Sequence, residues 1–288
     1  MTAPATAPAP GGSAFRQVGG LDVLTWPAFD PFGVDVMVTT RRGGVSSGPF
    51  AALNLSLNVG DAPAGVLENR RLVAAALGAD PAGFVFAEQV HGGRATVVGA
   101  AERGLGTRTP DDAISGTDAL VTGDAGTVLA VLAADCVPIV LYDPARHVIA
   151  CAHAGWRGTV ARVAASAVRA MESLGTRPGD VIAGIGPAVA GDRYEVGAEV
   201  FEAAERCLAD ASAQALRSVG AGRWLFDLPA ANRVVLREAG VPEARIHVTD
   251  VPTGPVGSGW FFSHRAERPC GRFALVARLR PRESGGSR

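Results

Sequence analysis

The chain has 288 residues, of which 48% are hydrophobic and 19% charged, a composition typical of a soluble globular protein with a sizeable core. All 27 basic residues are arginine, which excludes a Schiff-base lysine and a P-loop lysine, so phosphate recognition would need arginine, backbone amides or a metal ion. A formal net charge of −1 without any Lys/Arg block argues against a nucleic-acid partner.

The two ends of the chain differ in composition from the part between them. Residues 1–13 are rich in Ala and Pro and are predicted to form a disordered tail, and residues 282–288 a flexible one. Residues 14–281 are predicted to form a single compact domain. The start lacks the basic and apolar runs of a signal peptide, and four cysteines without a CxxC pair fit reduced thiols. These features predict a cytoplasmic protein with no membrane association.

Hydrophobic periodicity predicts strands and helices that mix irregularly along the chain. In chain order we expect a strand at 34–39, a helix at 61–77, strands at 84–90, 118–121, 127–133, 137–142 and 147–154, a helix at 160–174, a strand at 181–185, helices at 195–208 and 227–238, and strands at 246–249 and 273–278. Because strict βαβ alternation is missing, the pattern favours an α+β fold, a mixed α/β sandwich of sheets layered with helices.

The strands at 137–142 and 147–154 are predicted to pair as an antiparallel hairpin, because the residues between them have turn chemistry. If the turn is centred between Pro144 and Ala145, Cys136 lies opposite His153. Directly opposed residues in such a pair hold their Cβ atoms roughly 4.5–5.5 Å apart. A thiol and an imidazole at that separation could share a metal ion or act as a nucleophile and its base.

The helix that follows this hairpin is expected to begin at Thr159 as N-cap and to stop at Gly175. A helix N-terminus offers free N–H groups and a partial positive charge, which suit an anion, and Arg157 adds a positive charge beside it. The sequence therefore predicts a Cys/His centre next to an anion site.

The same stretch carries a resemblance to a known family. The runs ADCVPIVLYD and AHAGWRGT occur in one order with TTRRGGVSSGPFAALNLSLNVGD, EQVHG, TDALVT, IGPAV, YEVG, FDLPAANRVVL and FFSHR, over about residues 35–275. This ordered set resembles the YfiH-type family, also called the laccase-domain or polyphenol oxidase family, whose members are also described as purine nucleoside phosphorylases. The resemblance implies one compact domain of mixed sheets and helices.

The resemblance implies a metal centre held by His91, Cys136 and His153. Two His and one Cys with a fourth position open are typical of a catalytic zinc site, so Zn²⁺ is the expected cofactor. Cys151 is a rival ligand because the period of a strand places it on the same face as His153, but cross-strand pairing and the family pattern favour Cys136. Cu²⁺ is less favoured, because a multicopper oxidase needs a further His-rich cluster and the sequence has only five histidines.

The activity implied by the resemblance is phosphorolysis of adenosine, inosine and methylthioadenosine, with adenosine deamination as a side activity. Its partners would be a small-molecule nucleoside and phosphate. Phosphorolysis needs an anion clamp, for which Arg157, Arg41 and Arg265 are the candidates. Cys136 and the adjacent Asp135 are candidate catalytic residues, with Asp135 as a proton donor or acceptor, or as an orienter of a ligand.

Two further residues are expected to contact substrate. Asn54 belongs to the family-like loop that also contains Arg41, and Gln89 shares a strand face with His91. The composition of the loop at 41–48 alone would favour a solvated turn, and the resemblance reverses that preference for Arg41 and Asn54.

The sequence is also compatible with other functions. The chain could be a metal-free cysteine hydrolase with Cys136 as nucleophile and His153 as base, or a cysteine or zinc hydrolase that edits peptidoglycan precursors, as some members of the family are described. It could also be a copper-dependent polyphenol oxidase (laccase), or a non-catalytic nucleotide-binding or scaffold protein. A monomer or a small homo-oligomer is expected.

Overall fold

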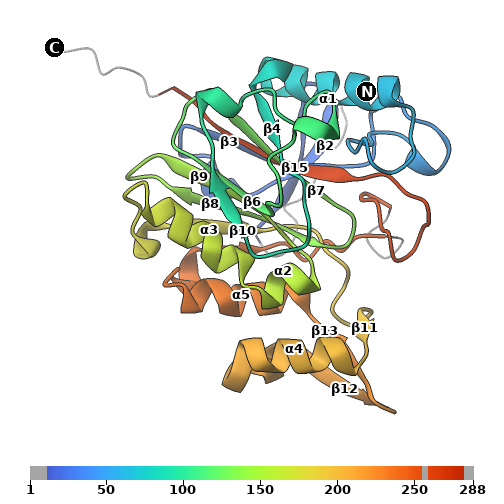
Figure 1. Ribbon diagram of the computed structural model, residues 1–288, viewed down its shortest axis with the longest axis vertical. Helices are drawn as coiled ribbons and strands as arrows, with labels where there is room; N and C mark the ends of the chain where they lie inside the picture. The colour runs from blue at the N-terminus through green and yellow to red at the C-terminus, as the bar shows by residue number, and fades with distance from the viewer. Residues whose placement is uncertain (1–11, 255–258, 282–288) are drawn as a thin grey trace.

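Two six-stranded sheets lie face to face with helices on both outer faces, as the computed structural model in Figure 1 shows. The structure describes residues 12–254 and 259–281. The first sheet has the order β1-β2-β3-β15-β7-β4, and its strands are β1 (Ala14–Val18), β2 (Leu21–Thr25), β3 (Val34–Thr39), β15 (Phe273–Leu279), β7 (Val128–Ala133) and β4 (Phe84–Phe86).

The second sheet has the order β14-β10-β8-β9-β6-β5. Its strands are β14 (Ile246–Val248), β10 (Ile182–Ile185), β8 (Val137–Asp143), β9 (Val148–Ala154), β6 (Ala119–Thr122) and β5 (Ala95–Val97). A separate three-stranded sheet, in the order β11-β13-β12, consists of β11 (Glu195–Val196), β13 (Arg223–Phe226) and β12 (Leu216–Gly220).

The helices lie outside the layer between the two large sheets, and three of them pack on the outer faces of those sheets. They are α1 (Pro63–Leu77), α2 (Trp156–Val160), α3 (Val163–Glu172), α4 (Ala198–Leu208) and α5 (Leu228–Glu238). Helix α1 packs on the first sheet, whereas α3 and α5 pack on the second, on the opposite side of the molecule (Figure 1). The predicted ends of two helices are confirmed: Gly78 closes α1 in the left-handed conformation, and the Asp227 side chain caps α5 by accepting from the Ala230 N–H.

The strands of the second sheet are apolar because their side chains are buried on both faces of the sheet. Val38 and Val131 of the first sheet contact the layer formed by Val140 and Ile149 of the second, and all four are buried. Neighbouring residues on β8 and β9, such as Ile139 and Ala150, instead face α3. Strands buried on both faces read as continuous apolar runs, which is the pattern seen at 137–142. The predicted mixed α/β sandwich is confirmed.

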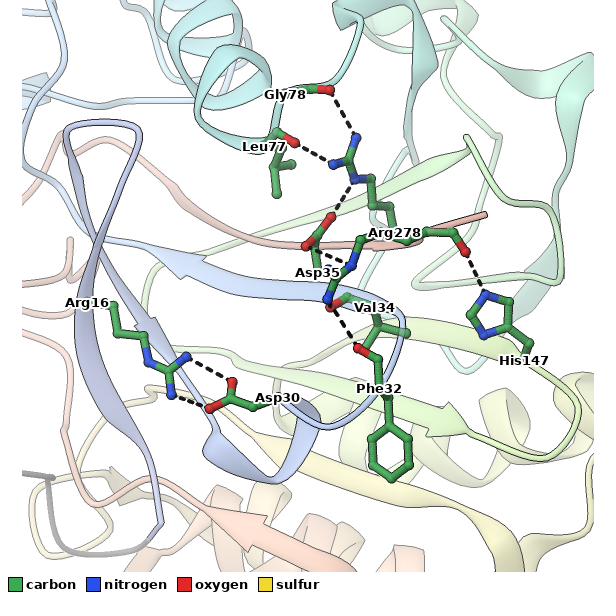
Figure 2. A network of polar contacts seen from close by, with 10 residues as sticks. Arg16, Asp30, Phe32, Val34, Asp35, Leu77, Gly78, His147 and Arg278 are labelled. Atoms are coloured by element: carbon green, nitrogen blue, oxygen red, sulfur yellow. Dashed lines mark hydrogen bonds and ion pairs between the residues drawn. The ribbon is translucent and has the colours of Figure 1, made fainter. Parts of the chain in front are cut away.

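Arg278 joins the first sheet to its helix, as Figure 2 shows. Its guanidinium forms an ion pair with Asp35 of β3 and donates to the last carbonyls of α1, Leu77 O and Gly78 O. A cation at this position satisfies helix-end carbonyls that have no partner within the helix. Nearby, His147 Nε2 lies 2.9 Å from Arg280 O, which ties the β8–β9 turn to the end of β15.

Several predicted boundaries were wrong for local reasons. The strand expected at 84–90 ends at Phe86, and the helix expected at 195–208 begins only at Ala198, after the short strand β11. The strands β1, β2, β5, β12 and β13 were not predicted. The helix expected at 160–174 begins only at Val163, as α3, because Arg162 adopts the left-handed conformation at φ 60° and separates it from the short helix α2.

The predicted tails lie almost entirely outside the described residues. Ser13, at the end of the expected N-terminal tail, is buried, and its hydroxyl donates to the Thr249 hydroxyl at 2.9 Å. In the described part of the chain, none of the helices combines the length and the apolar character needed to span a bilayer.

Candidate metal centre and active site

Three side chains from separate parts of the chain converge at one end of the sandwich. His153 lies on β9, Cys136 in the turn between β7 and β8, and His91 in the loop after β4. One ligand atom from each lies within 4.8 Å of the other two. Zinc bonds of about 2.0–2.3 Å would place tetrahedral ligands roughly 3.5 Å apart, so a bound ion would draw the three closer.

The β8–β9 hairpin has a different register from the one predicted. Pro138, not Cys136, lies opposite His153, and Asp143 pairs with Val148. The turn therefore contains four residues, 144–147, and His147 adopts the left-handed conformation at φ 59°. The Asp143 carboxylate stabilises this longer turn by accepting from Ala145 N–H at 2.8 Å and Arg146 N–H at 3.2 Å. Because the shift is an even number of residues, Cys136 keeps its face and still reaches His153.

Asp118 orients two of the three candidate ligands, and it was not predicted from the sequence. Its fully buried carboxylate lies 2.9 Å from His153 Nδ1 and accepts from the backbone N–H groups of Val90, His91 and Gly92. With Nδ1 facing Asp118, Nε2 of His153 is left to face Cys136. Carboxylates that fix the tautomer and the ring of a metal-ligating histidine in this way are a recurrent feature of zinc sites.

The backbone at the site comes close to the ligands. A Cβ atom at Gly155 would lie 2.8 Å from Cys136 Sγ and 3.0 Å from His91 Cδ2. Gly155 is also the N-cap of α2, four residues before Thr159, the predicted cap. Thr159 is instead buried inside this first turn, where its hydroxyl accepts from Asn232 Nδ2 at 2.9 Å. His91 itself adopts a left-handed conformation at φ 60°.

The charges of the cluster depend on one another. Burial alone would raise the pKa of Cys136, but the neighbouring His153 and His91 lower it to about 6. Burial would lower the pKa of His153, but Cys136 and Asp118 raise it to about 9. Burial also opposes ionisation of Asp118, yet its hydrogen bonds from His153 and the backbone hold its pKa below the usual value. In metal-free protein at neutral pH, Cys136 is therefore a thiolate beside an imidazolium.

We expect iodoacetamide to alkylate Cys136 first in metal-free protein, with a rate that rises through a midpoint near pH 6. A cysteine with an ordinary pKa of about 8.5 would react slowly at neutral pH. Cys151 is the internal control, because it is fully buried and burial alone raises the pKa of its thiol. Mass spectrometry of peptides sampled across a pH series gives the midpoint for each thiol. A midpoint near 8.5 for Cys136 would contradict this account of the cluster.

A cavity of about 750 Å³ opens beside the cluster. Its lining includes all three candidate ligands, Gln89 and His264. The Gln89 amide makes two hydrogen bonds with the backbone of Leu132, through Nε2 to Leu132 O at 2.8 Å and through Oε1 to Leu132 N at 2.7 Å. Gln89 thus lines the cavity wall while continuing the hydrogen bonding of the β7 edge.

Asn54 lies in the packed interior behind the cavity wall. It is fully buried, its Nδ2 donates to Ser56 O and Asp61 Oδ2, and its Oδ1 accepts from the N–H groups of Ser56 and Arg272. Its amide is satisfied by the protein, and the described lining of the cavity does not contain it. The geometry gives Asn54 a role in holding the segment around residue 55.

The three predicted clamp arginines point to other partners. Arg41 pairs with the Glu267 carboxylate at 3.0 Å and stacks on Phe262. The side chain of Arg157 is 60% exposed, lies over Trp156 and approaches Glu199 at 3.9 Å. In the described residues that line the cavity, neither of these arginines is present.

Arg265 and Asp135 form one local unit on the other side of Cys136. The Arg265 N–H donates to Asp135 Oδ2 at 2.6 Å, and its guanidinium donates to Glu195 O. Asp135 Oδ1 accepts from the Thr253 hydroxyl at 2.5 Å, and the residue adopts φ 89°. A non-glycine residue in this conformation is strained, and both carboxylate oxygens of Asp135 are used to hold it. Asp135 therefore fixes the backbone that presents Cys136.

Comparison with known proteins identifies the group to which this chain belongs. The sequence model of the family described as multi-copper polyphenol oxidoreductase laccase matches residues 35–280. The chain belongs to this laccase-domain family. The assignment to the YfiH-type family, which the sequence motifs suggested, is confirmed.

Relatives within the laccase-domain family carry two kinds of name. Purine nucleoside phosphorylase SCO2081 of Streptomyces coelicolor is 42% identical over 236 residues, which cover 82% of this chain and 91% of the relative. Adenosine deaminase RL5, from an unknown prokaryotic organism, is 39% identical over 214 residues, with 74% and 82% covered. The crystal structure of YlmD from Geobacillus stearothermophilus has a TM-score of 0.88 at 36% identity and covers 93% of this chain and 99% of its own.

The three ligand side chains limit which metal ion this member of the laccase-domain family could bind. Two imidazoles and a thiolate fit Zn²⁺ and also fit a single copper ion. Within the described residues, His91, Cys136 and His153 form the one group of three or more such side chains placed to hold an ion. His147 contacts Tyr142 and Arg280 O at its two ring nitrogens. The geometry thus supports a single-metal centre and offers no second cluster for multicopper chemistry in the described part of the chain.

Proposed function

We propose that this protein is a zinc-dependent purine nucleoside phosphorylase that acts on adenosine, inosine and methylthioadenosine, with adenosine deamination as a side activity. One observation carries the proposal: the His91, Cys136 and His153 cluster lines a cavity of about 750 Å³ in a chain 42% identical to a protein named as such a phosphorylase. A cavity of this size suits a small-molecule ligand such as a nucleoside. The relative named adenosine deaminase supports the second activity.

Three residues of the site would bind the metal, and two others would position those ligands. His91, Cys136 and His153 would be the ligands, and Zn²⁺ would supply Lewis-acid chemistry at its open position. Asp118 keeps the His153 ring in place through Nδ1, and Asp135 fixes the backbone beside Cys136. In phosphorolysis a phosphate oxygen forms a bond to ribose C1′ while the C1′–N9 bond breaks, and the proton lost by the hydrogen phosphate ends on a ring nitrogen of the departing purine.

The test of this function is the product pattern from three substrates. Adenosine, inosine and methylthioadenosine are each incubated with the zinc-loaded protein, with and without inorganic phosphate, and the bases and nucleosides are separated by chromatography. We expect base release that depends on phosphate for all three, and slow conversion of adenosine to inosine without phosphate. Base release that ignores phosphate would indicate a hydrolase, and no nucleoside turnover by the zinc-loaded protein would favour an activity on peptidoglycan precursors. A cytoplasmic location and a monomeric or small homo-oligomeric state remain predictions.

A further inference from the structure

We propose that Arg70 and Arg272 form the phosphate-binding subsite of the cavity that contains the metal-ligand cluster. This inference rests on the proposed function, because that function requires an inorganic phosphate next to the nucleoside. It assigns the anion to residues other than Arg41, Arg157 and Arg265. Both Arg70 and Arg272 line the same cavity as His91, Cys136 and His153.

Arg70 is a buried cation without a counter-charge. It is only 6% exposed, lies on α1 and stacks over the Phe86 ring at 3.8 Å. Its Nε donates to Leu55 O and its Nη1 to Gly106 O and Thr107 O, which are all neutral carbonyls. Over the described residues, no carboxylate lies within ion-pair distance, and burial lowers its pKa to about 10. A buried charge held this way gains from a bound anion.

The geometry leaves one nitrogen of Arg70 for a ligand. Nε and Nη1 account for three hydrogen bonds to protein, and Nη2 makes none to the described residues. Although Nη2 makes no hydrogen bond in the described part of the protein, it is not fully buried and retains access to open space. Arg70 lines the cavity, and we infer that this open nitrogen faces it. The carbonyl bonds and the Phe86 stack fix the guanidinium, so a ligand would meet a preorganised donor.

Arg272 is anchored to the same segment as Arg70. Leu55 O accepts from Arg70 Nε, while Leu55 N–H donates to Arg272 O at 3.0 Å. Arg272 N–H also donates to Asn54 Oδ1 at 2.9 Å. The Arg272 guanidinium donates through Nη1 to Cys270 O and Gly271 O, and within the described structure it has no carboxylate partner. Two cationic residues are thus held at one cavity wall by a shared backbone segment.

Besides the two arginines and the ligand cluster, the cavity wall contains two acidic residues and a histidine whose charge Arg272 affects. Glu88 and Asp111 also line the cavity, but the Glu88 carboxylate accepts from the Ser115 hydroxyl and the Gly116 N–H. His264 lines the wall too, and burial together with Arg272 and Arg268 lowers its pKa, which favours the neutral imidazole. A neutral imidazole can stay beside a guanidinium without repulsion. The cavity therefore offers a cluster ready for metal and a pair of arginines ready for a phosphate dianion.

The decisive experiment compares Arg272→Gln and Arg70→Gln with Arg108→Gln, all in the full-length zinc-loaded protein. Arg108 is an exposed arginine next to Thr107 and is absent from the described lining of the cavity, so it controls for a general loss of positive charge. Inorganic phosphate binding is measured by calorimetry, and KM values for phosphate and for adenosine are measured separately. We expect each cavity variant to weaken phosphate binding by about tenfold to a hundredfold, the range for losing a charge-assisted hydrogen bond.

The same variants separate this inference from the proposed function. Adenosine deamination needs no phosphate, so its rate should change less than twofold in the control variant Arg108→Gln. Circular dichroism shows whether Arg70→Gln and Arg272→Gln are folded, and either folded variant is sufficient for the test. Phosphate binding that falls in the cavity variants of a protein without phosphorolysis would support the subsite and overturn the proposed function. Phosphorolysis with unchanged phosphate KM in Arg272→Gln would overturn the subsite and leave the function standing.

Discussion

Cys136→Ala is expected to lose nearly all bound zinc and to reduce nucleoside turnover by at least about a hundredfold, because one of three protein ligands is removed. Wild-type protein should carry about one zinc per chain. The thiolate is also one of two negative charges that raise the pKa of His153, so its removal lowers that pKa and leaves Asp118 as the remaining charged partner of the imidazole. Elemental analysis of purified protein and the nucleoside assay are measured on the same preparation.

Cys151→Ala is the matched control for this change. Cys151 lies on the same strand as His153 and the same face, but its side chain belongs to the core between the sheets. It is fully buried, so the variant loses some stability from the space left behind, but it should keep its zinc. Equal zinc retention in the two variants would show that Cys136 is not the ligand.

Asp118→Asn is expected to weaken zinc affinity by about tenfold to a hundredfold and to lower turnover in the same range, as for other groups that orient a metal ligand. The carboxylate accepts hydrogen bonds from His153 Nδ1 and from three backbone N–H groups. An amide supplies only one acceptor oxygen, and its NH₂ would face groups that are themselves donors. The loop that carries His91 and the ring of His153 would then both lose their fixed positions.

Asp143→Asn separates this effect from a loss of stability. Asp143 is also fully buried and lies at the other end of the same hairpin, where it accepts from two N–H groups of the turn. The Asp143→Asn variant should have a lower unfolding temperature than the wild type and an unchanged zinc affinity. Competition with a chromophoric chelator measures affinity in both variants, and calorimetry measures stability. If both variants bind zinc like the wild type, Asp118 has no role in orienting the ligands.

Local patterns were sufficient for the parts of the site that belong to one hairpin. The two apolar strands and the turn between them indicated that Cys136 and His153 share a face, and this is correct although the register differs. The register depended on whether Asp143 begins the turn or ends the strand, and its side-chain bonds to Ala145 and Arg146 decide this. Such bonds form only in the folded turn, so spacing alone could not fix the centre.

The role of Asp118 could have been predicted from the sequence. The antiparallel pairing of β6 with β9 places Ala119 opposite Ala152, which makes Asp118 the neighbour of His153. A charged residue at the start of a buried strand, beside a candidate ligand, was a signal for a buried hydrogen-bond partner. The irregular loop that brings His91 to the site has no periodic pattern, and only the family resemblance pointed to that histidine.

The cavity arginines could not be predicted from composition. Arg70 lies on α1, where an arginine usually belongs to a solvated face, and its burial results from contacts with Phe86 and the loop at residues 106–107. Those contacts join segments far apart in the sequence. The arginines that the motifs suggested, such as Arg41, are paired with an acidic or carbonyl partner that also comes from a distant segment. Which arginine retains an open donor is thus a property of the tertiary structure.

The most direct test of the central claim is ³¹P nuclear magnetic resonance of adenosine and inorganic phosphate incubated with zinc-loaded protein. We expect a growing signal of ribose 1-phosphate, in amounts equal to the adenine released, and its loss in the Cys136→Ala variant. Adenine release without ribose 1-phosphate, or the same signal from wild type and Cys136→Ala, would contradict it.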